Sequence, residues 1–282
     1  MPWTRSYEEA EPQRVNRWLA QSGVCSRREA DELIAEGLVS IDGARVDDAG
    51  RKIAPGQTLT LADRAAAGLE ARFTAVLNKP VGLVSGQPEP GRTPAVRLIT
   101  ADRQEGHGPV PARDAALPPL GRLDGDSRGL LLLSEDGVLA KAVVGPSSQL
   151  DKEYLVRVGG SVTREKLDLL RHGLELDGRA LKPAKVAQLA DEATLRFTLT
   201  EGRNRQIRRM CALVNLWVLD LHRIRIGPLR LGDLPEGRWR ALTAEERDAL
   251  ISSAHPREGG DLGPAAHRPP RSAGARSPPS RG

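Results

Sequence analysis

A change of pattern near residues 62–72 constrains the fold most strongly, because this Ala- and charge-rich segment separates two differently built halves. Before it, helical and strand patterns close into a small module. After it, strands outnumber helices and are joined mainly by turns, which predicts an α+β domain with a mainly antiparallel sheet. The chain has 282 residues, enough for two domains of ordinary size.

The first module combines two helices with a small hairpin. Apolar residues at helical spacing over 15–19 predict the first helix. Ser26 and Glu29 form a capping-box pattern, so a second helix is expected to begin at Arg27. Asp42-Gly43 is a strong hairpin turn. The strands predicted beside this turn and after it cover residues 38–41, 45–46 and 58–61.

The second half carries a longer run of elements. A strand interrupted by Pro and Gly is expected over 75–85, a short helix over 95–99, and a buried strand over the leucines 130–133. The stretch 86–119 is rich in Pro, Gly and Arg, and such a long irregular segment is usually either functional or disordered. The remaining strands are predicted at 152–158, 185–189, 195–200, 218–226 and 239–242, and the helices at 163–172, 205–214 and 244–252.

The two ends of the chain show no helical or strand pattern. We expect an unstructured arm over residues 1–13 and a disordered basic tail over 254–282. The tail holds five arginines against two acidic residues, which is +3 of the formal net charge of +5. It could contact RNA phosphates or be a dispensable extension.

Composition excludes several classes of protein. No window approaches ~18 uninterrupted apolar residues, so a membrane span is not expected. The N-terminus lacks an apolar signal core, and two cysteines cannot build a disulfide framework or a Cys-rich zinc site. We therefore expect a cytoplasmic protein with reduced cysteines. A pI near 9.5 is compatible with a nucleic-acid partner.

The glycine-flanked loop at residues 121–129 places Asp124 and Asp126 just before the leucine run. A loop held by a buried strand is a common way to present a catalytic acid, base or nucleophile. The loop is not a P-loop, since Gly-Lys-Ser/Thr is missing. Its spacing nearly fits an EF-hand, but Arg128 stands where a cation would repel Ca²⁺. A plain Asx turn at Asp124 remains the alternative.

A second segment, 201–211, contains four arginines within seven residues and no acid among them. Such density on a helix calls for an anion nearby, either an RNA phosphate or a buried carboxylate; a solvated cationic face is the alternative. Tyr154, at the start of a predicted strand, could stack on a base or fill the core. The charges of the first module balance, so two interpretations of it stay open: it presents a basic face to RNA, or it is a neutral structural module. Its early bases are Arg14, Arg17, Arg27 and Arg28.

Together these segments resemble the ribosomal RNA pseudouridine synthases that carry an S4 RNA-binding domain. The similarity covers residues 14–253 in the order and spacing of that family. The Asn204-Arg-Gln-Ile-Arg-Arg-Met-Cys form is most similar to the large-subunit (23S) synthases of the bacterial F-type. The motifs that carry the resemblance begin at Arg14, Ser22, Gly37, Leu77, Gly121, Lys152 and Gly202.

The resemblance implies an S4 domain at 14–62, a linker at 63–73 and a catalytic domain at 74–253. It implies that Asp124 is the catalytic aspartate, that Tyr154 stacks on the target base, that Arg208 pairs with the aspartate and that Ile207 contacts the base. The basic residues Arg14, Arg17, Arg27 and Arg28 are expected to bind RNA through the S4 domain. Those expected to contact the substrate are Arg122, Arg203, Arg205, Arg209 and Lys79.

The implied reaction breaks the N-glycosidic bond of a uridine and rejoins the uracil through C5. It needs no redox step, so no cofactor and no metal are expected. One ionised carboxylate begins it, by attack at C1′ or by removing a C2′ proton; the sequence leaves both routes open. The implied partner is ribosomal RNA, taken from its stack by base flipping, and we expect a monomer.

The chain departs from the family pattern in two places. Ser127 replaces the more usual Thr, and the 86–119 stretch is longer and richer in Pro and Gly than is typical. An S4-domain ribosome-assembly factor that has lost activity is the alternative function. Another S4 protein, such as an aminoacyl-tRNA synthetase, is disfavoured because no nucleotide-binding signature is present.

Overall fold

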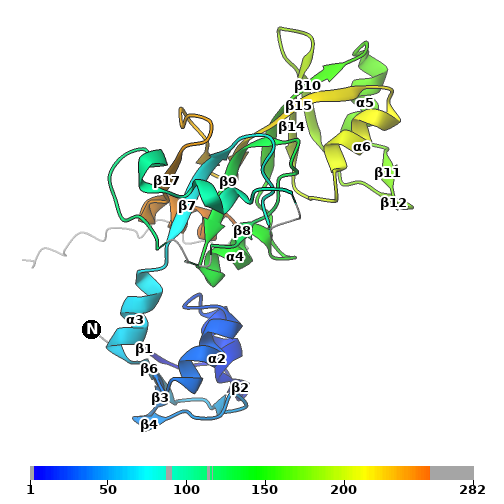
Figure 1. Ribbon diagram of the computed structural model, residues 1–282. Coiled ribbons are helices and arrows are strands. Elements are labelled where there is room, and N and C mark those ends of the chain that lie inside the picture. Colours follow the sequence, from blue (N-terminus) through cyan, green and yellow to red (C-terminus); the bar gives the residue numbers. More distant parts are fainter. Residues whose placement is uncertain (1–2, 87–90, 113–114, 116, 255–282) are drawn as a thin grey trace, which may run out of the picture.

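The computed structural model describes residues 3–86, 91–112, 115 and 117–254, which form two domains joined by one helix (Figure 1). The N-terminal domain packs two helices, α1 (Val15–Gln21) and α2 (Arg27–Ala35), on a small sheet of order β1-β6-β3-β4. The strands of this domain are β1 (Thr4–Ser6), β2 (Gln13–Arg14), β3 (Val39–Ile41), β4 (Ala44–Arg45), β5 (Lys52–Ile53) and β6 (Thr58–Leu61).

Local signals in this domain are confirmed. Ser26 accepts a hydrogen bond from the backbone N–H of Glu29, and the Glu29 carboxylate accepts one from the Ser26 N–H, which completes the capping box. Asp42 and Gly43 both have positive φ, +49° and +81°, as the two-residue turn between β3 and β4 requires.

The expectation of an unstructured arm over residues 1–13 is wrong for its described part. β1 pairs with β6 through Thr4↔Thr60, and Tyr7 is only 1% exposed. The Tyr7 ring packs edge-on against Trp18, with ring centroids 5.5 Å apart. The arm is ordered by this aromatic contact and by its pairing with β6, a strand more than fifty residues further along the chain.

The expected linker is a helix, α3 (Asp63–Glu70), and Ala65 on it is buried in the N-terminal core. The domains also touch beside it. The Glu29 carboxylate accepts a long hydrogen bond from the Gly137 N–H (3.5 Å) and pairs with Arg72 (3.3 Å). The N-termini of α2 and α4 (Gly137–Val144) therefore meet at one acidic side chain, as favoured by their helix dipoles.

The second domain is built on a nine-stranded sheet whose main order is β13-β14-β10-β15-β9-β7-β17. In the described part of the chain, β9 and β15 are parallel and every other strand pair of this sheet is antiparallel, which confirms the α+β class. Its strands are β7 (Thr74–Lys79), β8 (Pro119–Leu120), β9 (Arg128–Ser134), β10 (Lys152–Gly159), β13 (Lys185–Gln188), β14 (Thr194–Leu199), β15 (Trp217–Ile226), β16 (Leu229–Arg230) and β17 (Trp239–Ala241).

Helices cover both halves of this sheet. Every strand and helix predicted after residue 150 is present. Their ends lie within one residue of the predicted ends, except that the last helix extends two residues further. A small hairpin, β11 (Glu175–Leu176) with β12 (Arg179–Ala180), and the helix α4 were not predicted. The other helices are α5 (Arg164–Arg171), α6 (Gln206–Leu213), α7 (Ala244–Ala254) and the 3-10 turns η1 (Ala95–Leu98) and η2 (Ala101–Arg103).

The leucine run 130–133 forms the predicted buried strand, on β9, which lies between β15 and β7 in the sheet. Leu130 and Leu132 face a core shared with α4 and α7, whereas Leu131 and Leu133 face a second core containing Trp239. The strand is apolar throughout because both of its faces are covered. Part of the irregular 86–119 stretch supplies the second cover.

The predicted basic tail, beyond Ala254, lies outside the residues that the structure describes. Both cysteines, Cys25 and Cys211, are free and buried. Within the described residues, none of the helices has the length and apolar character needed to span a bilayer.

Candidate active site

A pocket of about 590 Å³ opens where β9 and β15 diverge, between the 121–127 loop and the start of α6. β9 and β15 pair over only two residues, so the sheet separates there. The pocket brings together most of the side chains that the sequence singled out. Those that line it are Arg122, Asp124, Tyr154, Arg203, Arg205, Ile207 and Arg208.

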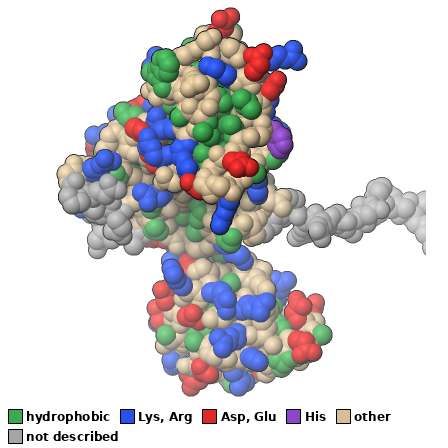
Figure 2. Space-filling view, turned by 90° about the vertical axis from the view of Figure 1, so that its right-hand side faces the viewer, with side chains coloured by type: hydrophobic (Ala, Val, Ile, Leu, Met, Phe, Trp, Pro, Cys, Tyr) green, Lys and Arg blue, Asp and Glu red, His purple; other side chains and the backbone are tan. Residues whose placement is uncertain are grey.

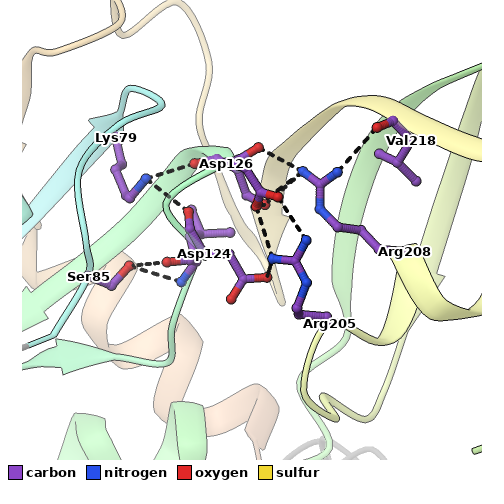
Figure 3. A network of polar contacts seen from close by, with 9 residues as sticks. Lys79, Ser85, Asp124, Asp126, Arg205, Arg208 and Val218 are labelled. Carbon is purple, nitrogen blue, oxygen red and sulfur yellow. Dashed lines mark hydrogen bonds and ion pairs between the residues drawn. The ribbon is translucent and has the colours of Figure 1, made fainter. Parts of the chain in front are cut away.

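Buried polar groups hold the Asp124 loop on the side away from Arg205 and Arg208 (Figure 3). The Lys79 ammonium donates to three carbonyl oxygens, of Pro80 (2.9 Å), Asp124 (3.2 Å) and Ser127 (2.7 Å). The Ser85 hydroxyl donates to the Leu123 carbonyl (2.7 Å) and accepts from the Leu123 N–H (3.0 Å). These bonds fix the backbone on both sides of the aspartate.

The expectation that Lys79 contacts substrate is therefore wrong. Lys79 is 0% exposed and does not line the pocket, because its ammonium is taken up by the loop carbonyls. Burial lowers the pKa of Lys79 to about 8, although the negative charges of Asp126 and Asp124 act to raise it. Lys79 therefore holds the backbone of the loop that carries Asp124 and does not reach the substrate.

Lys79 should make folding stability depend on pH. Between pH 8 and the ordinary lysine pKa near 10.5, Lys79 keeps its proton in the unfolded protein and has released it in the folded protein. The free energy of unfolding therefore rises with pH over this range. We expect the free energy of unfolding of the wild type to gain about 2 kcal/mol over Lys79→Met between about pH 7 and pH 10. Urea unfolding of both proteins checks this, and a constant difference would contradict it.

Three ion pairs join Arg205 and Arg208 to the two aspartates of the loop, and they differ from the expected pairing. Arg205, not Arg208, pairs with Asp124, at 3.2 Å. Arg208 instead reaches Asp126, donating to its carbonyl (2.7 Å) and pairing with its carboxylate (3.3 Å). The expected pairing of Arg208 with the aspartate is thus not present, because Arg208 is also tied to the Val218 carbonyl on β15 (3.3 Å).

Arg205 reaches the aspartates because of an unusual backbone conformation. It is the N-cap of α6 with φ +48°, a left-handed conformation that is costly for a long side chain. Its guanidinium also pairs with Asp126 at 2.8 Å. Burial acts to raise the pKa of Asp126, but the Arg205 hydrogen bond and the Arg208 charge outweigh it and lower that pKa.

The two remaining arginines of the segment have structural partners. Arg203 lines the pocket, and its guanidinium donates to three carbonyls of the β11–β12 hairpin, including Ala180 (2.6 Å). Arg209 points away and pairs with Asp177 at 2.6 Å. Arg209 does not line the pocket, and the expectation that it contacts substrate stays a prediction.

Tyr154 and Ile207 form the apolar part of the pocket wall. Tyr154 is half-buried and packs against the cores on both sides of the pocket. Ile207 is 4% exposed and lies on the first turn of α6. Of the two interpretations left open for Tyr154, the structure is compatible with both at once: one part packs in the core and another faces the cavity.

Sequence reasoning missed three pocket or loop residues of note. Lys152 and Arg223 line the pocket, and Ser85 clamps the loop. Ser85 and Lys152 lie within quoted motifs, but no local signal shows where their side chains point. Arg223 is opposite Tyr154 across the β10–β15 pair, a contact that only the sheet register defines.

The N-terminal domain carries a basic groove. Arg14, Arg17 and Arg27 line it together with Lys52, which was not predicted, and Arg28 does not line it. On the face seen in Figure 2, Lys and Arg side chains gather in the middle of this lower domain, with acidic side chains toward its edges. The balanced charges of the module are therefore segregated in space, as a nucleic-acid surface requires.

Comparisons with known proteins agree with this architecture. Residues 13–59 match the S4 domain family, and residues 74–213 match the RNA pseudouridylate synthase family. The chain is 33% identical over 94% of its length to the dual-specificity RNA pseudouridine synthase RluF of Escherichia coli (strain K12), covering 87% of that protein. It is 36% identical over 87% of its length to an uncharacterized RNA pseudouridine synthase of Mycobacterium bovis, covering 96% of it.

A solved pseudouridylate synthase superposes with a TM-score of 0.58 and 27% identity, over 84% of this chain and 99% of that one. The α+β fold, the N-terminal S4 domain and these relatives define an RNA-modifying isomerase. The chain belongs to the RNA pseudouridine synthase family.

Proposed function

We propose that this enzyme isomerises a specific uridine of ribosomal RNA, in the 23S molecule, with Asp124 as the catalytic carboxylate. The observation that supports the proposal most directly is the placement of Asp124. It lies in a pocket beside Tyr154, on a loop clamped by Lys79 and Ser85, and within 3.2 Å of the Arg205 guanidinium.

The chemistry needs a carboxylate that stays ionised at the ribose. A neighbouring guanidinium favours the charged form even in a partly desolvated site. Asp124 begins the reaction either by attack at C1′, which forms an Asp124–C1′ ester bond as the N1–C1′ bond breaks, or by taking the C2′ proton. When C5 bonds to C1′, the ester bond breaks again or the proton returns to C2′. The N1–C1′ bond breaks, the uracil turns, C5 bonds to C1′, and the C5 proton is lost while N1 gains one. No electron leaves or enters, so no redox partner is required.

The detached uracil must turn without escaping, and the pocket offers a wall for that. Tyr154 supplies a flat face and Ile207 an apolar contact, while the target nucleotide is flipped out of its stack. Arg122 and Arg203 also line this pocket, where they bind the RNA on either side of the target nucleotide. We propose a monomer that acts in the cytoplasm, where ribosomal RNA is found.

The RNA assignment is tested by tritium release. Transcripts of 23S, 16S and transfer RNA are made with [5-³H]uridine, because isomerisation releases the C5 hydrogen. We expect release from the 23S transcript; release only from 16S would overturn the 23S assignment. The transfer RNA arm is included because the similar Escherichia coli protein is called dual-specificity. Binding of RNA without release from any transcript would favour the inactive assembly factor.

The basic groove should set RNA affinity and not the chemical step. Replacing Arg17 and Arg27 by Gln removes two cations from the groove, and each lost phosphate contact weakens binding without touching the pocket. We expect KM to rise about 10-fold or more with kcat within about twofold of wild type. Arg64→Gln is the matched control, since Arg64 is exposed on α3 and does not line the groove. A selective loss of kcat would contradict the assignment.

A further inference from the structure

The cations around the pocket are compensated unevenly. On the α6 side, each arginine that lines the pocket has a carboxylate at hand. Arg203 pairs with Glu201 at 3.4 Å, and both Arg205 and Arg208 pair with Asp126, at 2.8 and 3.3 Å. This wall needs no further negative charge.

The cations of the pocket lining that lie outside the α6 side have no carboxylate partner within the described residues. Arg122, Lys152 and Arg223 are three such cations. Among the residues that the structure describes, none of these three has a carboxylate oxygen within 4.0 Å. The neighbouring Asp151 pairs with Arg225, at 2.7 Å, and its charge acts on Lys152 without forming an ion pair with it.

Arg223 is the deepest of the three and is incompletely bonded. Its side chain is 1% exposed; Nε donates to the Leu130 carbonyl (2.7 Å) and Nη1 to the Arg122 carbonyl (3.4 Å). Its Nη2 is buried and has no hydrogen-bond partner. A buried guanidinium that meets only carbonyls is unfavourable, and a nearby anion would stabilise it.

Lys152 lines the same pocket with its charge nearly free. It is half-buried, and the one hydrogen bond of its ammonium, to the Leu150 carbonyl, is long at 3.4 Å. Burial first and the charge of Arg223 second lower its pKa, although the negative charge of Asp151 acts to raise it. Two cations that repel each other across a cavity form a site for an anion, and a neutral base carbonyl would leave both charges uncompensated.

We propose that Lys152 binds a backbone phosphate of the substrate RNA beside the target nucleotide, and that the buried Arg223 positions this phosphate by its charge. The phosphate would draw the strand toward these two cations and leave the base free to enter the pocket beside Tyr154. The identity of that phosphate rests on the proposed function. The existence of the anion site does not, because it follows from the uncompensated cations alone.

The test measures RNA binding without turnover. The dissociation constant of a fluorescent oligouridylate is determined from about 50 to 400 mM KCl for wild type and for Lys152→Gln. Losing one phosphate contact on a single strand should reduce the slope of log affinity against log salt by about 0.7. Lys152→Arg should restore the slope. Lys166→Gln should leave it unchanged, because Lys166 is a half-buried lysine of α5 that donates to the Ser161 carbonyl and does not line the pocket.

An unchanged slope in Lys152→Gln, or an equal change in Lys166→Gln, would overturn the proposal. So would an unchanged slope accompanied by weaker binding of free uridine, which would assign Lys152 to the base. Because binding is read directly, a protein that isomerises no uridine but shows the slope change would refute the proposed function and leave the anion site standing. Thermal melting of each variant confirms that it is folded.

Discussion

Asp124→Asn should lower the single-turnover rate of uridine isomerisation by at least about 10⁴-fold, because the amide can neither attack C1′ nor accept a C2′ proton. RNA affinity should stay within about threefold, since the carboxylate is partly exposed and the basic groove lies in the other domain. Rapid-quench tritium release gives the rate, and filter binding gives the affinity.

The matched control is Asp177→Asn. Asp177 is also paired with an arginine of the 203–209 segment, but it lies outside the pocket, so its replacement should leave the rate unchanged. Asp126→Asn should fall between the two, because it frees Arg205 and Arg208 without removing the reacting carboxylate. An Asp124→Asn protein as fast as Asp177→Asn would refute the catalytic assignment.

Gly129→Ala should unfold the catalytic domain or destabilise it by at least about 3 kcal/mol. A Cβ at Gly129 would lie 2.3 Å from the Arg223 carbonyl oxygen and 2.8 Å from its nitrogen, and φ there is +107°. This contact is where parallel β9 and β15 meet, so relief of the clash must separate the strands that frame the pocket. Urea unfolding measures the loss.

Gly173→Ala separates the two causes. Gly173 has almost the same φ, +102°, but a Cβ there would meet no atom within 4 Å. We expect it to cost only about 1–2 kcal/mol, from backbone strain alone. If both substitutions destabilise the protein equally, the close approach of β9 and β15 is not what requires glycine at 129.

Elements encoded by neighbouring residues could be predicted from the sequence. The capping box at Ser26 and Glu29 and the turn at Asp42 depend on contacts within a few residues, and the structure contains them. The N-terminal arm could not be predicted in this way. Its strand lies against residues more than fifty positions away, and nothing in the arm itself shows an alternating pattern.

The site residues divide in the same way, into those that a local motif indicates and those whose contacts depend on distant residues. Motif order indicated Asp124, Tyr154 and the arginine-rich segment, and all of these meet at one pocket. The pairing of Arg205 rather than Arg208 with Asp124 depends on a left-handed backbone at the start of α6. The burial of Lys79 depends on a loop some 45 residues further along the chain. Neither feature has a local signature.

Site-resolved mapping of pseudouridine tests the central claim most directly. Unmodified 23S ribosomal RNA, free and within immature ribosomal particles, is incubated with wild type or with Asp124→Asn, and every pseudouridine is located by chemical labelling and reverse transcription. We expect a new pseudouridine at a defined position that wild type makes and the variant does not. The absence of any new pseudouridine in either form of the RNA, or the same new site with both proteins, would contradict it.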